Sequence, residues 1–318
     1  MTNKLPVILD VDTGIDDAVA IVMACYQKQL DVKLITCCFG NVEQAHVVKN
    51  TITVLENINK QNIPVARAES VALDSQTFKI RAHGINGLGG YQKEIRTQPI
   101  DEDYCKAMHR VVSQNELTYI IVCGPYTNLA KDIHKIKVIA VTGSTVSDKQ
   151  NPYINFNIQV DNASMKYVLK KIPNIIFCTS DMGHKAYIPS SDFIKSAKCS
   201  EAGRFLATLY PSHKDRTVNN GAALHDACGV AWLVKPNMFK IRFAKAEFKI
   251  AKNGKEYWVA RNMAVACFVF APINGEWCVL ANQRGTGTPD FQGLWNCPCG
   301  YLDFDETTKQ AAIREVFE

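Results

Sequence analysis

The chain has 318 residues and a mass of 35.4 kDa, which suits one large α/β domain or two ordinary domains. Hydrophobic residues make up 47% and charged residues 21%, so a large buried core is possible and global disorder is excluded. The net charge of +5 is too small for a dedicated nucleic-acid binder, whose basic residues should also cluster, so we expect no nucleic-acid partner.

The apolar segments and the cysteines indicate the compartment. No stretch approaches the roughly 18 consecutive apolar residues of a membrane helix, and the start MTNKLPVILDVDTG meets aspartates too early for a signal peptide. Six of the twelve cysteines lie inside apolar runs, namely Cys25, Cys37, Cys123, Cys178, Cys267 and Cys278. Such positions are typical of reduced core residues, and no cysteine pair has a partner pair at zinc-site spacing. We therefore expect a cytoplasmic protein with no membrane partner and no structural zinc.

Apolar runs alternate with helical patterns along most of the chain. Strands are expected at 5–12, 31–39, 63–66, 119–123, 138–141 and 175–179, and helices at 16–28, at 42–59 and from 127. This alternation predicts the α/β class, with a mainly parallel open sheet and helices on both faces. Ligands bind such sheets outside the carboxyl ends of the strands, so polar residues at these ends are site candidates.

The pattern changes near residue 246. Asn253-Gly254 and Asn274-Gly275 each stand between alternating runs and predict two hairpins, with no helix between them. The lysines of the first hairpin favour a solvated face over a nucleic-acid patch. We place a domain boundary near 262, which predicts domains 1–262 and 263–318.

Four aspartates, Asp10, Asp12, Asp16 and Asp17, fall within eight residues. The first two share one face of the strand end, and the last two open the next helix after a turn at Gly14. Carboxylates this close repel one another, so either some are protonated or a cation lies among them. Oxygen ligands favour Ca²⁺ or Mg²⁺. Helix capping is the alternative, and it explains Asp16 or Asp17 singly. It does not explain Asp10 and Asp12, because unpaired charges at the end of an apolar strand are costly to bury.

A strand that ends in Asp-x-Asp also opens the haloacid-dehalogenase-like phosphatases, in which the first aspartate is the nucleophile. That family has Gly-Thr after the second aspartate, whereas this chain has Thr13-Gly14. The family does not require a second acidic pair, and its downstream Gly-Asp loop is not found here. The metal interpretation is therefore favoured.

The segment DVDTGIDDAVAI resembles the signature of the inosine–uridine nucleoside hydrolase family. Further blocks follow in that family's order: Gly40-Asn41-Val42, His83–Gly90, Gly124–Ala130, Phe156-Asn157-Ile158 with Asp161, His184-Lys185-Ala186 and His225-Asp226. Seven blocks in order over residues 5–239 are specific, although each block alone is weak. The resemblance implies a nucleoside N-ribohydrolase that releases ribose and free base from ribonucleosides, as in purine and pyrimidine salvage.

The resemblance also implies a ligand set for Ca²⁺. Asp12, Asp17, Asp226 and the backbone carbonyl of Thr127 would hold the ion, which activates a water. Asp12 would also be the general base, and Asp10 would orient the ligands.

The remaining implied roles concern the substrate. Asp16 and Asn157 would bind ribose hydroxyls, and Asp226 would reach the ribose from the metal. Asn41 would face the ribose or the base, and the alternative is an ordinary turn residue, since Gly-Asn is common in turns. The transition state would be oxocarbenium-like, and His225 would donate a proton to the departing base. His83 would either contact the ligand or brace its loop. The resemblance further implies a homo-oligomer, a dimer or a tetramer.

Two positions depart from the family pattern near the ribose 5′ end. Asn155 stands where members commonly have Glu, and Lys149 stands where an upstream Asn is common on an ungapped count. An acid is lost and a base is gained, so one hypothesis is a 5′-phosphorylated substrate. The alternative is drift in a loop. The family also usually continues past the first hairpin with a strand and a helix, where here a second domain begins.

Residues 293–318 resemble the start of a Nudix domain. Gly300, Glu306 and the run Arg314-Glu315-Val316-x-Glu318 have the spacing of the Nudix box, although Cys299 stands where Gly is usual. This implies a partial α+β unit in which Glu315 and Glu318 bind Mg²⁺ if the box is completed. An amphipathic helix with surface acids is the alternative.

The box is not completed within this chain, so we expect no independent Nudix activity from it. The main prediction is metal-dependent N-glycosidic hydrolysis of a nucleoside or nucleotide. Two alternatives stay open: a nucleoside- or nucleotide-binding protein of weak activity, and a part of a bifunctional nucleotide hydrolase with a Nudix domain.

Overall fold

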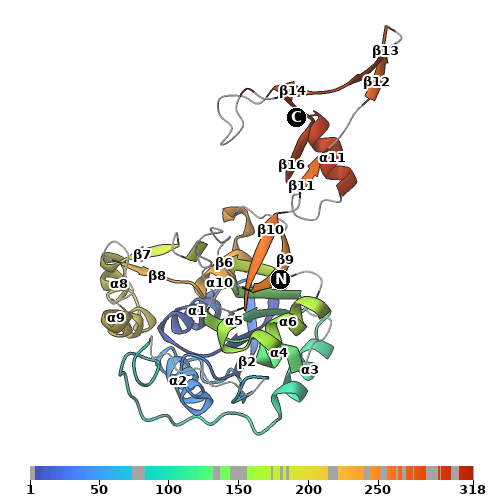
Figure 1. Cartoon of the computed structure of the whole chain (residues 1–318). Coiled ribbons are helices and arrows are strands. Elements are labelled where there is room, and N and C mark those ends of the chain that lie inside the picture. Colours follow the sequence, from blue (N-terminus) through green and yellow to red (C-terminus); the bar gives the residue numbers. More distant parts are fainter. Residues whose placement is uncertain are drawn as a thin grey trace. The chain divides into compact units, whose positions relative to one another are not determined.

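The computed structural model divides the chain into two compact units, Met1–Met238 and Phe239–Glu318 (Figure 1). The structure describes residues 4–73, 83–131, 137–143, 156–172, 175–179, 182–183, 186–213, 221–239, 244–250, 256–262, 264–266, 270–274, 276–283, 293, 295–301 and 308–317. The predicted boundary near 262 falls within the second unit, between two of its strands, and stays a prediction.

A six-stranded parallel sheet with the order β3-β2-β1-β4-β5-β6 forms the centre of the first unit. Its strands are β1 (Leu5–Val11), β2 (Leu30–Cys37), β3 (Val65–Arg67), β4 (Tyr119–Val122), β5 (Lys137–Gly143) and β6 (Ile175–Thr179). The winding direction reverses between β1 and β4, because β2 and β3 lie on one side of β1 and β4 to β6 on the other. The carboxyl ends of β1 and β4 are therefore the place where an open α/β sheet binds its ligand.

Helices cover both faces of this sheet, which confirms the predicted fold class. On one side, α1 (Ile15–Tyr26) packs against α2 (Gln44–Asn57), α9 (Glu201–His213) and α10 (Ala227–Val234). On the other side, α3 (Tyr104–Ser113) packs against β2 and β3, and α4 (Thr127–Lys131) and α5 (Phe156–Val160) pack against α6 (Asn162–Lys171) (Figure 1). Shorter elements are α8 (Ser190–Ser196), the 3₁₀ helix η2 (Pro236–Met238) and the antiparallel pair β7 (Tyr187–Pro189) and β8 (Gly221–Ala223).

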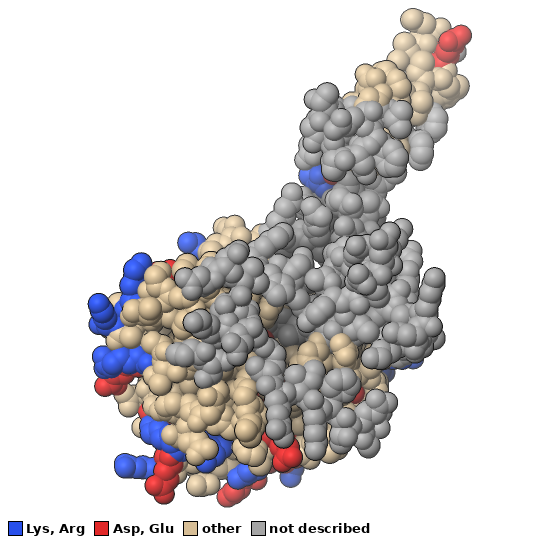
Figure 2. Space-filling model, turned by 60° about the vertical axis from the view of Figure 1, so that its left-hand side comes forward, with Lys and Arg blue, Asp and Glu red and all other residues tan. Residues whose placement is uncertain are grey.

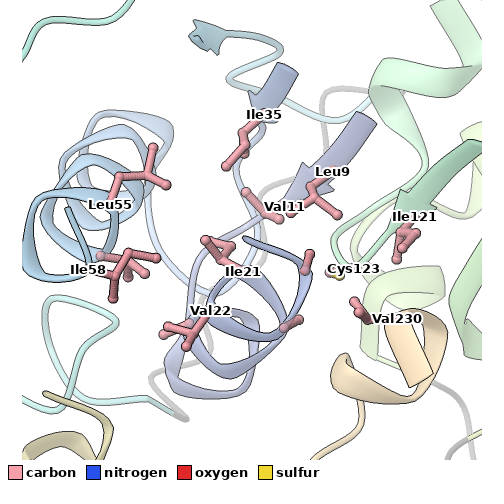
Figure 3. Close-up of a cluster of buried hydrophobic side chains, with 14 of the residues drawn as sticks. Leu9, Val11, Ile21, Val22, Ile35, Leu55, Ile58, Ile121, Cys123 and Val230 are labelled. Atoms are coloured by element: carbon pink, nitrogen blue, oxygen red, sulfur yellow. The ribbon is translucent and has the colours of Figure 1, made fainter. Parts of the chain in front are cut away.

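A buried hydrophobic cluster fixes the position of β1 against α1 and α2. Figure 3 shows Leu9, Val11, Ile21, Val22, Ile35, Leu55, Ile58, Ile121, Cys123 and Val230 of this cluster. Burying one such aliphatic side chain stabilises the fold by about 1.5–3 kcal/mol. Because side chains of a strand alternate, the burial of Leu9 and Val11 in this cluster directs Asp10 to the opposite face of the sheet.

The described residues of the second unit form four antiparallel strand pairs and one helix. They are β9 (Ala244–Ile250) with β10 (Glu256–Asn262), β11 (Ala264–Ala266) with β16 (Cys299–Tyr301), β12 (Phe270–Ile273) with β13 (Glu276–Val279), β14 (Asn282–Gln283) with β15 (Trp295–Asn296), and α11 (Thr308–Phe317). Ile273 pairs with Glu276 across the predicted turn, and Asn274 has φ 52°, as a tight hairpin turn requires. Both predicted hairpins are therefore confirmed, although residues 251–255 lie outside the described part.

Charged side chains of both signs are interspersed on the face of the first unit that Figure 2 shows. Local pairs of opposite charge include Lys33 with Asp31 at 2.6 Å and Arg110 with Glu102 at 2.7 Å. The described part of this face therefore mixes both signs of charge. No helix among the described residues combines the length and the apolar character needed to cross a membrane.

Candidate metal centre

Three chain segments bring acidic and sulfur ligands together at the carboxyl edge of the main sheet. Asp12 directly follows β1, and Asp17 lies in the first turn of α1. Cys123 directly follows β4, and Asp226 directly precedes α10. One carboxylate oxygen each of Asp17 and Asp226 and the sulfur of Cys123 lie within 4.8 Å of one another. Residues more than 200 positions apart in the sequence thus meet at the switch point of the sheet.

The Asp12 carboxylate lies in a cradle of main-chain atoms. The backbone N–H of Asn41 donates to Asp12 Oδ2 at 2.8 Å. A Cβ added at Gly40 would lie 2.1 Å from the same oxygen, and one added at Gly124 would lie 3.1 Å from the Asp12 Cβ. The turns after β2 and β4 therefore need glycine next to this carboxylate, because any larger residue would occupy its space.

Asp17 is held by one oxygen and leaves the other without a donor. The N–H of Gly14 donates to Asp17 Oδ2 at 2.8 Å, and Asn41 Nδ2 donates to it at 3.4 Å. Asp17 Oδ1 is buried and has no N–H donor in the described part of the chain, and the Asp17 carboxylate also contacts the Asp226 carboxyl, with which it can share a proton. An unsatisfied buried acceptor costs about 1–3 kcal/mol, and a bound cation would remove that cost.

Burial and mutual repulsion favour the protonated forms of these acids. The pKa of Asp17 rises to about 7, first because the group is buried and then because Asp16 repels its charge. Burial and the neighbouring aspartates raise the pKa values of Asp12 and Asp226 well above the usual range as well. The centre therefore holds protons at neutral pH unless a cation offsets the negative charge. A buried set of carboxylates fits a hard divalent ion such as Ca²⁺.

Asp10 supports the turn that follows β4. Its Oδ1 accepts hydrogen bonds from Thr36 Oγ1 and Asn128 Nδ2, both at 2.6 Å. Burial raises the pKa of Asp10 to about 6, and the two hydrogen bonds oppose that rise. Because Asn128 follows Thr127 in α4, Asp10 helps to position the residue whose carbonyl we expect to face the ion.

Thr127 is fully buried at the start of α4. Its hydroxyl donates to Asp161 Oδ2 at 2.6 Å. The Asp161 carboxylate also accepts from the N–H of Leu73 at 2.9 Å and from the N–H of Ser164 at 3.0 Å. The Thr127 side chain is therefore anchored, and a contact of its carbonyl with a cation stays a prediction.

His83 braces the start of α1. The N–H of Ile15 donates to His83 Nδ1 at 3.2 Å, so Nδ1 is the unprotonated ring nitrogen. The other nitrogen, Nε2, lies 3.5 Å from Asp16 Oδ1. A Cβ at Gly14 would lie 2.9 Å from the imidazole ring, so the turn and the ring are closely packed. These contacts are those of a brace, and a contact with substrate stays a prediction.

Asn157 and His225 lie next to the same centre. Asn157 is buried in α5 and donates through Nδ2 to the carbonyl of Cys123 at 2.5 Å. His225 is half-buried beside Asp226, and a Cβ added at Gly183 would lie 2.0 Å from His225 Nδ1. Asn157 thus contacts the residue that contributes the sulfur, His225 adjoins Asp226 in the chain, and the roles of both residues toward a substrate stay predictions.

Three predicted site residues, Lys149, Asn155 and Glu318, lie outside the described residues. The His184-Lys185 block also lies outside them. Glu315 is half-buried in α11, where its Oε1 lies 2.5 Å from Arg314 Nη1. The predicted Mg²⁺ role of Glu315 is therefore left as a prediction.

The sequence interpretation missed three residues of this neighbourhood. Cys123 lies in an apolar run, and it does pack in the core, but it also borders the acids. Its position directly after a strand that ends at the carboxyl edge was the available signal. Asn128 and Asp161 lie within matched blocks, yet their contacts with Asp10 and Thr127 span 118 and 34 residues. Only the folded chain reveals such long-range partners.

Comparison with known proteins gives two family matches. The model of the inosine–uridine preferring nucleoside hydrolase matches residues 7–286, and the model of the NUDIX domain matches residues 260–318. The non-specific ribonucleoside hydrolase RihC of Salmonella paratyphi A (strain ATCC 9150 / SARB42) is 30% identical over 330 aligned residues, which cover 100% of this chain and 99% of that protein. RihC of Escherichia coli (strain SMS-3-5 / SECEC) is 28% identical over 98% of both chains.

Solved structures of nucleoside hydrolases share the fold. A plant nucleoside hydrolase, the PpNRh1 enzyme, superimposes with a TM-score of 0.69 at 21% identity over 98% of this chain and 97% of that one. A purine-preferring ribonucleoside hydrolase from Gardnerella vaginalis gives the same TM-score of 0.69 and identity of 21%, over 80% of this chain and 88% of that one. At these identities the likeness concerns the fold alone.

Proposed function

Because this chain belongs to the inosine–uridine preferring nucleoside hydrolase family and is a nucleoside N-ribohydrolase, we propose that it cleaves its substrates with the help of one divalent cation. The proposed ion is Ca²⁺, held by Asp12, Asp17, Asp226 and the backbone carbonyl of Thr127. The observation that carries this proposal is the buried pair Asp17 and Asp226, in which Asp17 Oδ1 accepts no hydrogen bond from the described residues.

The surrounding side chains supply the remaining chemistry. When bound, the cation supplies the Lewis acidity that makes water a nucleophile near neutral pH. Asp12 would take the proton from this water, since the backbone around Gly40 and Asn41 holds its carboxylate in one direction. The positive charge that develops on the ribose ring would be stabilised by the buried carboxylates.

Substrate contacts follow from the same edge of the sheet. Asp16, Asn41 and Asn157 would bind the ribose hydroxyls, and Asp226 would contact both the ribose and the ion. His225 would donate a proton or a hydrogen bond to the departing base, because a histidine can hold that proton near neutral pH. The ring is confined by Gly183, which fixes its direction.

Ribonucleosides with different bases are the proposed substrates, as the name of the non-specific ribonucleoside hydrolase relatives indicates for those proteins. Lys149 and Asn155 still support the second hypothesis, a substrate with a 5′-phosphate, since lysine binds phosphate as a point charge. Turnover of inosine and uridine compared with their 5′-monophosphates separates the two. A clear preference for the unphosphorylated forms would end the phosphate hypothesis.

The main test measures release of free base from a panel of ribonucleosides. We expect release with Ca²⁺, loss of release after chelation, and recovery when Ca²⁺ is restored. Asp12→Asn should lower the rate by about 10²–10⁴-fold, as expected for removal of a general base. Asp31→Asn is the matched control, because Asp31 is a half-exposed aspartate whose ion pair with Lys33 lies on the strand surface.

Release that is indifferent to the chelator would refute the metal proposal. A folded protein that binds ribonucleosides but releases no base would instead favour the binding protein of weak activity. Far-ultraviolet circular dichroism of each variant shows whether it is folded.

Further expectations concern the assembly and the second unit. We propose a cytoplasmic homo-oligomer, and light scattering after size-exclusion chromatography measures its mass. For the second unit we propose a Mg²⁺ contact through Glu315 and Glu318 when the Nudix box is complete. Calorimetric Mg²⁺ titration of a chain that is extended through the whole box tests that contact, and Glu315→Gln should weaken the binding.

A further inference from the structure

Cys123 is a thiol that borders the acids of the metal centre. Its sulfur and one carboxylate oxygen each of Asp17 and Asp226 lie within 4.8 Å of one another. The residue is a free cysteine and is 2% exposed. Figure 3 shows its side chain in the hydrophobic cluster, near Val230 of α10. Cys123 therefore stands at the boundary between the apolar core and the acidic cluster.

A second observation shows that this position can take a ligand. Asp17 is fully buried, and its Oδ1 accepts no hydrogen bond from the residues that the structure describes. The main chain at Cys123 is also fixed, because Asn157 donates to its carbonyl at 2.5 Å. The Asp17 carboxylate, which has one unsatisfied oxygen, and the Cys123 thiol, whose main chain is anchored, thus belong to one small group of donors.

This group of donors combines hard and soft ligands. Carboxylates suit Ca²⁺, whereas a thiolate selects Zn²⁺ and similar thiophilic ions. The three donor atoms lie within 4.8 Å of one another, so small side-chain movements bring each of them to the roughly 2.0–2.3 Å that zinc ligands take. Three protein ligands with one open position form a common zinc arrangement. Ca²⁺ binds oxygen ligands and not sulfur, so the Cys123 thiol has no role in the proposed hydrolysis.

We propose that Cys123, Asp17 and Asp226 bind a thiophilic divalent cation, Zn²⁺, which excludes Ca²⁺ and stops hydrolysis. The inference rests on the proposed function, because it assigns Asp17 and Asp226 to both ions. On binding, a bond forms between the Cys123 sulfur and the metal, and the thiol proton leaves to water. No electron transfer is involved. The reaction is therefore reversible by a zinc chelator, followed by Ca²⁺.

Before the metal binds, Cys123 is a neutral thiol. Burial raises its pKa well above the usual value, and repulsion from Asp226 and Asp17 raises it further. Proton loss is therefore coupled to the arrival of the cation. This explains how a cysteine can lie among acids without adding another negative charge to the Ca²⁺ form.

The direct test uses Cd²⁺ as a probe, because a Cd²⁺–thiolate bond absorbs in the ultraviolet. The full chain is used with Cys199, Cys297 and Cys299 replaced by Ser, so that these fully or partly exposed thiols do not contribute. We expect an absorption on Cd²⁺ addition that excess Ca²⁺ suppresses. Cys123→Ser should lose this Ca²⁺-sensitive absorption and bind Cd²⁺ about tenfold more weakly or worse.

Cys37→Ser is the matched control. Cys37 is also buried, but its thiol donates to Thr51 Oγ1 at 3.3 Å, and its sulfur is not one of the atoms of the group formed by Asp17, Cys123 and Asp226. Its Cd²⁺ absorption should equal that of the parent. The same Ca²⁺-sensitive absorption in Cys123→Ser would overturn the proposal. If Cys123→Ser does not fold, Cys123→Ala places an apolar side chain at this position and also removes the sulfur. Its Cd²⁺ absorption is then compared with that of the parent.

Inhibition gives an independent readout. With Ca²⁺ present, Zn²⁺ should inhibit base release by the parent. Half-maximal inhibition of Cys123→Ser should need at least about tenfold more Zn²⁺. Equal inhibition of both proteins would contradict the proposal. A Cys123-dependent Cd²⁺ absorption in a protein that hydrolyses nothing would uphold this inference and refute the proposed function. Ca²⁺-dependent hydrolysis without that absorption would do the reverse.

Discussion

Replacing Gly40 by Ala is expected to disable hydrolysis while the first unit stays folded. A Cβ at position 40 would lie 2.1 Å from Asp12 Oδ2 and 2.7 Å from Asp12 Cγ, well inside the 3.4 Å at which ordinary contacts begin. The next residue, Asn41, donates through its N–H to the same oxygen at 2.8 Å. The added methyl group must therefore displace the carboxylate or the turn, and either movement breaks this hydrogen bond.

The size of the effect follows from these distances. Relief of the contact needs a shift of more than 1 Å between the methyl group and the carboxylate. A misplacement of about 1 Å at a catalytic group costs on the order of 10²-fold in rate. This corresponds to about 2.7 kcal/mol of activation free energy. The loss of folding stability should stay within about 1–3 kcal/mol, because one hydrogen bond and one turn are affected.

The assay compares kcat for base release at saturating Ca²⁺ with the thermal midpoint of unfolding. Gly90→Ala is the matched control, because Gly90 has φ +88° and an added Cβ would meet nothing within 4 Å. This control strains the backbone without touching Asp12, so it should lower the midpoint and leave kcat unchanged. Parental kcat in Gly40→Ala would refute the role of the Asp12 cradle. Equal losses of kcat in both variants would assign the effect to backbone strain.

Three further predictions test the support of the centre. Asp10→Ala removes the shared acceptor of Thr36 and Asn128. This variant should bind Ca²⁺ about 10–100-fold more weakly, as measured by calorimetry, whereas Asp10→Asn should keep most of the affinity. Asp161→Ala removes the acceptor of the Thr127 hydroxyl and should lower the free energy of unfolding by about 1–3 kcal/mol. The same variant should bind Ca²⁺ more weakly. A binding constant equal to the parent's would disprove the anchoring role. The pKa of Asp17 is raised from 3.8 to about 7, so its protonated form stabilises the cation-free fold at low pH, and that stability is lost as pH rises from about 4 to 7. The free energy of unfolding of the chelated protein should therefore fall across this window by up to about 1.4 kcal/mol per pH unit, and the melting temperature should fall with it. Asp17→Asn should flatten this pH dependence.

The order of strands and the position of the acids could be predicted because both rest on local patterns. An apolar run followed by Asp12 and an amphipathic segment after Asp17 require no long-range information. The parallel arrangement follows from the helices between the strands, and it places strand ends at one edge. Helix ends were predicted less well: the helix expected at 42–59 runs from Gln44 to Asn57. No capping side chain marks its start, since Glu43 makes no side-chain cap bond.

The partners of the acids could not be predicted, because they come from distant segments. Asp10 bonds to Asn128, 118 residues away, and nothing in the local pattern of either residue indicates the other. Cys123 satisfies the pattern of a core strand, and its apolar packing is correct. The sequence cannot show that the same sulfur also faces two carboxylates, because this depends on where α10 begins relative to β4.

The acidic cluster also bears on the choice between an enzyme and a weak binding protein. Buried carboxylates with raised pKa values destabilise the fold in their ionised forms, and Gly40 adds the conformational cost of glycine. A protein that only bound nucleosides would need neither feature. Both costs are offset when a cation binds the folded state, which adds about 2.7 kcal/mol of stability at an ion concentration of 100 Kd. Stability that depends strongly on Ca²⁺ is therefore expected of a centre built for chemistry, and its absence would favour the binding protein.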